Sequence, residues 1–219
     1  MKIAGLQKIS LIDYPGKVST VIFTQGCNFR CGYCHNPQLV LPELFEPVIN
    51  EKTVFEYLDK RKGKIEGVVV TGGEPTLHND LAKLIRNIKK QNFLVKLDTN
   101  GSNPAVLKNL LNENLLDFVA MDVKAPLKKY SEISGVNIDT ESILASIKLI
   151  KGSGIKHQFR TTVVRRFSNV NDLLEIKELI NEKLYIQNFT ISDKILNSDL
   201  DNTYGWTEDE IKSMDYIIN

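Results

Sequence analysis

Short apolar segments alternate with amphipathic segments along nearly the whole chain of 219 residues. The apolar segments are rich in Val, Ile and Phe, as in strands that are buried on both faces of a sheet. They span residues 18–24, 67–71, 93–99, 117–124, 155–164 and 184–190. The segments between them have apolar residues at helical spacing, and helix starts are expected at Asn103-Pro104, at Thr140 and at Thr207 with Glu210. Six strands that alternate with six helices predict a parallel sheet covered by helices and built through right-handed crossovers.

The number of strand–helix units limits the possible architectures. Six units are too few for a closed eight-stranded barrel, so the candidates are an open partial barrel and a doubly wound sheet. No Gly- or Pro-rich linker, repeat or low-complexity tract interrupts the alternation, which predicts a single domain over residues 1–219. The longest segment without periodicity, residues 26–50, follows the first strand. A parallel α/β protein places its active-site loop at such a position.

Composition argues against several classes of function. The formal net charge is only +1, which gives no electrostatic support for a nucleic acid or an anionic membrane as partner. The N-terminus lacks the apolar region of a signal peptide, and no segment reaches the roughly 20 apolar residues of a membrane span. We therefore expect a cytoplasmic protein. Only three cysteines occur, all close together in the sequence, which argues against a disulfide framework.

The three cysteines, Cys27, Cys31 and Cys34, lie in the loop after the first predicted strand. Three soft thiolates in one short loop are typical of iron–sulfur ligation. Three ligands leave one iron of a four-iron cluster without a protein ligand, so that iron could bind a substrate. The alternatives are a structural zinc site, for which His35 is the nearest fourth ligand, and three unrelated buried thiols. Because a second ligand pair at zinc-finger spacing is missing from the sequence, we favour the cluster.

The pattern Cys-x3-Cys-x2-Cys, with Tyr33 before the third cysteine, resembles the radical S-adenosylmethionine (SAM) superfamily. The resemblance implies a partial (β/α)6 barrel, a parallel sheet with outer helices, and a 4Fe–4S cluster on Cys27, Cys31 and Cys34. It also implies that SAM chelates the fourth iron and is cleaved reductively into methionine and a 5′-deoxyadenosyl radical. Tyr33 matches the aromatic residue of the family motif, and His35, with Asn36, matches the stretch that borders the adenine in related activating enzymes. Taken alone, Tyr33 would be a packing residue and His35 a capping or solvent-facing one.

The ends of the second and third predicted strands carry further matches. Paired glycines allow close approach of the backbone, and a glutamate can accept from an ammonium group. Gly72, Gly73 and Glu74 resemble the GGEP motif of the superfamily, which implies that Glu74 binds the amino group of SAM. Asp98 and Thr99 belong to a DTNG segment, which in activating enzymes of this superfamily contributes to ribose and methionine contacts and to a monovalent cation site. Without the cysteine loop, a Gly-Gly turn and a helix-capping aspartate would explain these residues as well.

The fourth, fifth and sixth predicted strands bear on the same site. Asp122 and Lys124 form a D-x-K segment, which the resemblance assigns to the same ribose, methionine and cation contacts. Arg160 resembles an arginine on the fifth strand that approaches the polar end of SAM, although a structural salt bridge explains it nearly as well. The end of the sixth strand, residues 188–193, offers no histidine, unlike the pyruvate formate-lyase activating pattern.

The opening segments, residues 5–8 and 11–16, resemble the anaerobic ribonucleoside-triphosphate reductase activating proteins, which form a glycyl radical on a partner. The resemblance implies that reductase as partner and an electron donor of the flavodoxin or ferredoxin type. The alternatives are a pyruvate formate-lyase activating enzyme and a small-molecule enzyme similar to 7-carboxy-7-deazaguanine synthase. A non-enzymatic zinc or iron–sulfur binding module is the alternative from a different class.

Overall fold

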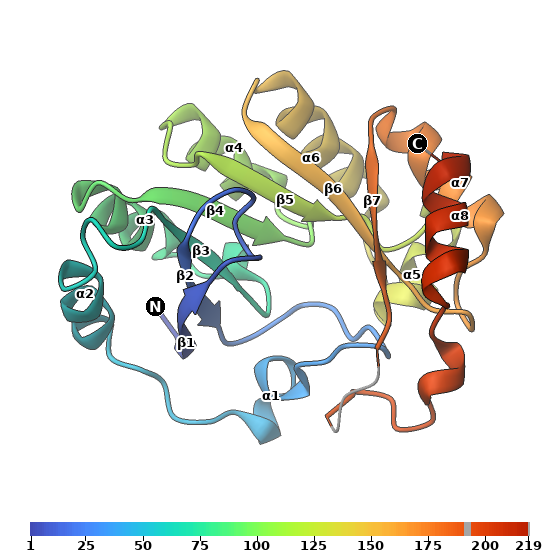
Figure 1. The fold of residues 1–219 in the computed structure, drawn as a ribbon, viewed down its shortest axis with the longest axis horizontal. Helices are drawn as coiled ribbons and strands as arrows, with labels where there is room; N and C mark the ends of the chain where they lie inside the picture. Colours follow the sequence, from blue (N-terminus) through green and yellow to red (C-terminus); the bar gives the residue numbers. More distant parts are fainter. Residues whose placement is uncertain (191–193, 219) are drawn as a thin grey trace.

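The computed structural model describes residues 1–190 and 194–218, and within them the chain forms a seven-stranded sheet. The strands lie side by side in sequence order: β1 (Ile3–Ser10), β2 (Ser19–Thr24), β3 (Gly67–Gly72), β4 (Leu94–Thr99), β5 (Phe118–Asp122), β6 (Lys156–Val163) and β7 (Leu184–Asn188). The six strands β2 to β7 are parallel, as predicted. Because β1 and β7 are the two edges of the sheet, the architecture is the expected open partial barrel (Figure 1).

Strand β1 is a strand that the sequence pattern does not predict. It runs antiparallel to β2, so the sheet is not wholly parallel. Only its first and last residues, Ile3 and Ser10, are buried. An edge strand with so few buried side chains has no continuous apolar run, which is why the strand pattern misses it.

The described residues contain eight α-helices: α1 (Pro37–Val40), α2 (Glu51–Asp59), α3 (Leu81–Lys90), α4 (Pro104–Asn112), α5 (Tyr130–Ser134), α6 (Thr140–Gly152), α7 (Val170–Ile180) and α8 (Glu208–Ile218). Short 3-10 helices lie at Pro42–Leu44, Pro75–Leu77, Leu127–Lys129 and Asn202–Tyr204. As predicted, Asn103 caps α4 by accepting from the Val106 amide. The cap of α6 is Asp139 rather than Thr140, because the Asp139 side chain accepts from the Glu141 amide. Helices α1 and α5 lie in loops and are too short for a periodic pattern.

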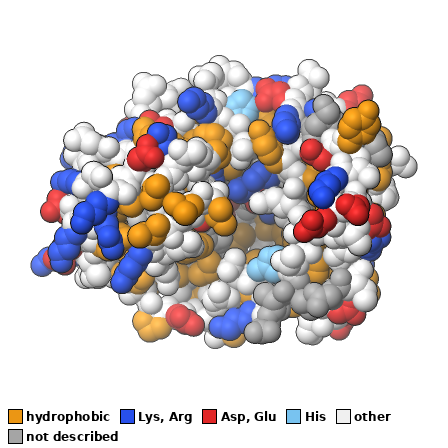
Figure 2. Space-filling model, in the orientation of Figure 1, with side chains coloured by type: hydrophobic (Ala, Val, Ile, Leu, Met, Phe, Trp, Pro, Cys, Tyr) orange, Lys and Arg blue, Asp and Glu red, His pale blue; other side chains and the backbone are white. Residues whose placement is uncertain are grey.

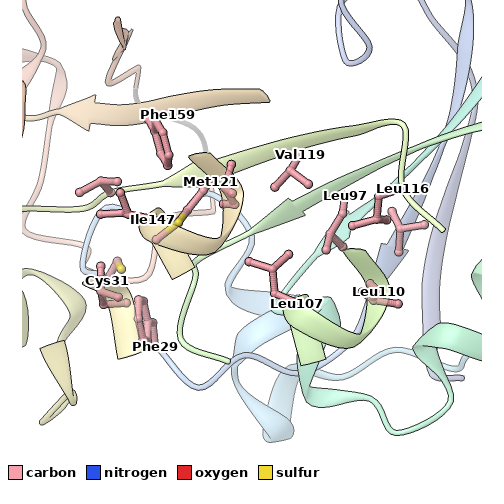
Figure 3. Close-up of a cluster of buried hydrophobic side chains, with 14 of the residues drawn as sticks. Phe29, Cys31, Leu97, Leu107, Leu110, Leu116, Val119, Met121, Ile147 and Phe159 are labelled. Carbon is pink, nitrogen blue, oxygen red and sulfur yellow. The ribbon is translucent and has the colours of Figure 1, made fainter. Parts of the chain in front are cut away.

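The two faces of the sheet carry separate hydrophobic clusters. Figure 1 shows α2, α3, α4, α6 and α7 around the outside of the curved sheet. On that side Leu97 and Val119 pack against Leu107 and Leu110 of α4 (Figure 3). The inner face carries a smaller cluster of Tyr14, Val21, Val69, Phe118 and Ala120. Within residues 1–190 and 194–218, no helix is long and apolar enough to cross a membrane.

Gly101 fixes the loop after β4 against the neighbouring strand. Its φ is +75°, a left-handed conformation that favours glycine. A Cβ at this position would overlap the Met121 side chain. The Gly101 carbonyl accepts from Ser146 Oγ of α6 at 2.6 Å, so the loop is held from both sides.

Gly101→Ala should lower the free energy of unfolding by about 2 to 5 kcal/mol, because backbone strain adds to overpacking against Met121. Gly154→Ala is the matched control. Gly154 also has a positive φ, +72°, but a Cβ there would meet no atom of the described chain within 4 Å. Its replacement should therefore cost only the strain, about 1 to 2 kcal/mol. Urea unfolding of both variants measures the difference, and equal losses would contradict the packing argument.

Candidate cofactor site

A cavity of about 300 Å³ lies at the carboxyl ends of the parallel strands. It has the size of a small-molecule site. All the residues predicted as metal or cofactor ligands line it: Cys27, Cys31, Tyr33, Cys34, His35, Gly72, Gly73, Glu74, Asp98, Thr99, Asp122, Lys124 and Arg160. Neighbouring parallel strands present their carboxyl ends at one edge of the sheet, which explains why distant motifs meet there. Figure 2 shows this face hollowed near its centre, with Lys or Arg side chains at one rim and a histidine at the other.

The cysteine loop, residues 26–36, is anchored to the body of the protein between β2 and α1. The Arg30 amide donates to the Ser134 carbonyl at 2.7 Å. Phe29 is buried and lies with Cys31 at one end of the main hydrophobic core (Figure 3). Packing of Phe29 therefore holds the neighbouring cysteines in place beside the cavity.

The thiols of Cys27, Cys31 and Cys34 are free in the described chain. Burial raises the pKa of the Cys27 thiol to about 11 and also raises the pKa of Cys31. Metal binding would therefore displace a proton from both of these thiols, Cys27 and Cys31. No three His, Cys, Asp or Glu side chains within residues 1–190 and 194–218 are grouped to hold a single ion, as the zinc alternative would require. Three free thiols around one cavity fit a four-iron cluster, in which each thiolate binds a different iron.

Gly72 and Gly73 bring the end of β3 against the start of the cysteine loop. Gly72 has a φ of +117°, and a Cβ there would collide with the Thr24 backbone. A Cβ on Gly73 would collide with the Gly26 carbonyl in the same way. The close approach predicted for these glycines is thus made by the backbone at the end of β3 to the backbone of residues 24–26. Any larger residue would push the cysteine loop away from β3.

The Glu74 carboxylate is fully buried and joins β3 to β4. Its Oε1 accepts from the Thr76 amide at 3.0 Å, from Thr76 Oγ1 at 2.6 Å and from Thr99 Oγ1 at 2.8 Å. Its Oε2 accepts from the Asn100 amide at 2.6 Å. Burial raises the pKa of Glu74, and these hydrogen bonds act in the opposite direction. Glu74 lines the cavity, and its Oε2 accepts only one hydrogen bond from the described residues, so Glu74 can both brace the loops and accept from a ligand.

Charged side chains on β4, β5 and β6 form a chain of ion pairs along the cavity floor. Arg160 donates to Asp98 Oδ2 at 3.2 Å and to Asp122 Oδ1 at 2.9 Å, and Lys124 donates to Asp122 Oδ2 at 2.9 Å. Lys96, which the sequence analysis did not select, pairs with Asp98 Oδ1. Burial alone would raise the pKa of Asp122, but Arg160 and Lys124 hold it below its ordinary value. The Asp122 carboxylate is therefore charged, and the salt bridge expected as the alternative for Arg160 is present.

Tyr33 and His35 line the part of the cavity nearest the cysteines. Tyr33 packs against Phe167, with ring centroids 6.2 Å apart, and among the described residues its buried hydroxyl has no hydrogen-bond partner. His35 stacks on Phe189, with ring centroids 5.5 Å apart and an angle of 12°, and its Nε2 donates to the Thr190 carbonyl. An unpaired buried hydroxyl beside a cavity fits a site for a polar ligand.

Thr162 and Gln187 line the far side of the cavity and were missed in the sequence. They are direct neighbours in the register of β6 and β7. Thr162 follows Arg160 by two residues and so faces the same side, a signal that could have found it. Gln187 reaches the cavity from β7, the strand whose end carries a histidine in the pyruvate formate-lyase activating pattern. Of the predicted strand end at residues 188–193, residues 191–193 lie outside the described part of the chain.

Comparison with known proteins places the chain in a family. The family model of the radical SAM superfamily matches residues 21–180. A Methanocaldococcus jannaschii protein, provisionally named a glycyl-radical enzyme activating enzyme, is 36% identical over 198 residues, which cover 87% of this chain and 81% of that protein. The pyruvate formate-lyase-activating enzyme of Clostridium pasteurianum is 32% identical over 133 residues, which cover 56% of this chain and 52% of that enzyme.

Solved structures agree with the fold. The structure of TYW1 with a lysine-pyruvate adduct bound aligns with a TM-score of 0.68 and 18% identity, over 91% of this chain and 72% of that one. At this identity the likeness concerns the fold alone. The family model and the relative from Methanocaldococcus jannaschii go further, because each spans most of the chain. The chain therefore belongs to the radical SAM superfamily, the enzymes that use a 4Fe–4S cluster and S-adenosylmethionine.

Proposed function

We propose that this chain forms a glycyl radical on a separate protein, and that the partner is the anaerobic ribonucleoside-triphosphate reductase. The observation that carries the activating role is the relationship to the Methanocaldococcus jannaschii protein over 87% of the chain. The segment of residues 11–16 supports the choice of the reductase, because this segment, together with residues 5–8, resembles the reductase activating proteins.

The same segment presents apolar side chains to solvent in the turn between β1 and β2. Leu11 is 73% exposed and Ile12 is 87% exposed. The turn is nevertheless ordered, because Ser10 Oγ donates to the Asp13 carboxylate and accepts from the Asp13 amide. Figure 2 shows hydrophobic side chains gathered over this hairpin, on the face that carries the cavity. Such patches mark protein interaction sites, which supports a protein as the substrate.

The open sheet also suits a protein substrate. Its edges, β1 and β7, belong to opposite ends of the strand order, so the sheet does not close around the cavity. A loop of the partner that lies across the inner face would complete the walls and exclude water from the reacting atoms. A small heterocycle, by contrast, would need a pocket enclosed by this chain itself.

We assign the cofactor contacts by charge and position. Cys27, Cys31 and Cys34 hold the cluster; Gly72 and Gly73 shape the wall beside it; Asp98 and Thr99 face the ribose; Tyr33, His35, Thr162 and Gln187 border the adenine. Glu74 accepts from the amino group of SAM, while Arg160 and Lys124, both braced by Asp122, attract its carboxylate. When bound, the cluster and SAM supply the electron transfer that yields methionine and a 5′-deoxyadenosyl radical. The chain itself orients these groups and keeps water out.

The electron comes, in this proposal, from a flavodoxin or ferredoxin type protein. Reductive cleavage of SAM consumes one electron, which the cluster has to receive from a donor. A reducing compartment such as the cytoplasm suits three free thiols.

Replacing Cys27, Cys31 or Cys34 by Ser should abolish an oxygen-sensitive 4Fe–4S cluster after anaerobic reconstitution, because each thiolate holds a separate iron. Iron and sulfide analysis together with visible absorption measures the cluster. His35→Ala is the control, since it keeps all three thiolates and should retain the iron. Stoichiometric zinc in the native protein, lost in His35→Ala, would instead support the zinc site.

Glu74→Gln should weaken SAM binding by about ten- to hundredfold, because a charged partner for the ammonium group is lost. Thr76→Val is the matched control: Thr76 donates to Glu74 but does not line the cavity. It should lower the free energy of unfolding by about 1 to 3 kcal/mol and leave SAM affinity within about twofold. Equilibrium dialysis and urea unfolding separate the two effects. Equal affinity losses in both variants would show that Glu74 only braces the loops.

Reduced enzyme mixed with SAM and the anaerobic reductase should give the doublet of a glycyl radical in electron paramagnetic resonance. A reductase with Ala in place of its radical glycine should give none. A doublet only with pyruvate formate-lyase would contradict the reductase as partner. Turnover of a small heterocycle without any glycyl radical would contradict the activating role while leaving SAM cleavage intact.

A further inference from the structure

Lys96 is a buried lysine on the inner face of the sheet that none of the motifs includes. Its side chain is 2% exposed. It precedes Asp98 by two residues on β4, so both side chains lie on the same face, and the Lys96 ammonium pairs with Asp98 Oδ1. Burial lowers the pKa of Lys96, and the charge of Asp98 acts against this shift. A lysine is almost never buried in this way unless its charge has a partner with a fixed position.

The protein's own cations already occupy the oxygens of both carboxylates on the cavity floor. Asp98 pairs with Lys96 through Oδ1 and with Arg160 through Oδ2. Asp122 pairs with Arg160 through Oδ1 and with Lys124 through Oδ2. Three cations therefore face two carboxylates. A sodium or potassium ion placed beside Asp98 or Asp122 would lie close to the positive charges of Lys96, Arg160 or Lys124, which is unfavourable.

These contacts do not fit the monovalent cation site that the resemblance to other activating enzymes implies. We propose that the Lys96 ammonium takes the place of that cation, and that it positions Asp98 for SAM without a bound metal ion. Lysine suits this role, because its ammonium is a compact charge with three donors on a flexible stem. Lys96 acts through Asp98 and is a positioning residue. The inference rests on the proposed role of the cavity as the SAM site.

The first test compares salts on the unmodified protein. SAM affinity of the reconstituted enzyme is measured in potassium chloride, sodium chloride and tetramethylammonium chloride at equal ionic strength. Because Lys96 supplies the cation, the three affinities should agree within about twofold. Affinity that is several-fold tighter in potassium or sodium than in tetramethylammonium would overturn the proposal, since a metal ion would then bind in addition to Lys96.

The second test removes the ammonium and asks whether a small cation restores its effect. Lys96→Ala should bind SAM about tenfold more weakly in tetramethylammonium chloride, and potassium or methylammonium chloride should restore most of the loss. Lys89→Ala is the matched control, because Lys89 pairs at 2.6 Å with Asp117, which does not line the cavity, whereas the partner of Lys96 does. It should show no preference among the salts. A weakened Lys96→Ala variant that no small cation restores would also overturn the proposal.

The third measurement does not depend on SAM. The midpoint of thermal unfolding of the cofactor-free chain is recorded in the same salts. Lys96→Ala should gain more from potassium or methylammonium chloride than from tetramethylammonium chloride, whereas the unmodified chain should not discriminate. If the unfolding midpoints of both proteins changed identically among the salts, the proposal that Lys96 replaces a cation would be wrong. If the unmodified protein did not bind SAM at all, the proposed function would be contradicted, but the thermal unfolding comparison could still be interpreted.

Discussion

The buried carboxylate of Glu74 joins two of the chain segments that surround the cavity, and Asn100 extends this connection to the cysteine loop. It accepts hydrogen bonds from Thr76 after β3 and from Thr99 and Asn100 at the end of β4. The Asn100 side chain donates in turn to Asn28 of the cysteine loop at 2.9 Å. A carboxylate is costly to bury unless hydrogen bonds compensate its lost hydration, so the order of these loops and the burial of Glu74 depend on each other. The cavity is therefore part of the folded core rather than an addition to its surface.

The register of β4, β5 and β6 brings Asp98, Asp122 and Arg160 into one network of ion pairs. Asp122 lies directly opposite Arg160 in the pairing of β5 with β6. Asp98 lies opposite Ala120, whose small side chain leaves room for the Asp98 carboxylate to reach Arg160 on the strand beyond. Because an unpaired charge in this position would be strongly destabilising, the network favours one register over its neighbours. The same pairs place Asp98, Asp122, Lys124 and Arg160 at the cavity, and Lys96 extends the network from its side of Asp98.

The two faces of the sheet have different roles: the outer face carries most of the hydrophobic core, and the inner face carries the charged groups of the cavity. The helices bury the larger cluster on the outside, including Leu84, Ile85 and Ile88 of α3. The inner face keeps only a small apolar cluster at its base, around Tyr14 and Phe118, whose rings lie 5.9 Å apart. Since the outer core supplies most of the buried apolar area, the inner face can carry charged groups. An open inner face also leaves part of the shielding of a radical to another molecule, in keeping with the proposed protein substrate.

Local patterns in the sequence determined the six parallel strands and most helix starts, and the family resemblance of its motifs selected most of the residues that line the cavity. They succeed because apolar periodicity is local, and because parallel strands always bring their carboxyl ends to one edge. Only the tertiary structure shows that β1 pairs with β2 at the edge of the sheet and that the Lys96 side chain is buried. β1 is an edge strand with little buried surface, and a lysine within a strand pattern is normally exposed, so neither has a local signature. The bracing of β4 by Glu74 and the position of Gln187 depend on strand register and sheet curvature, which join residues far apart in the chain.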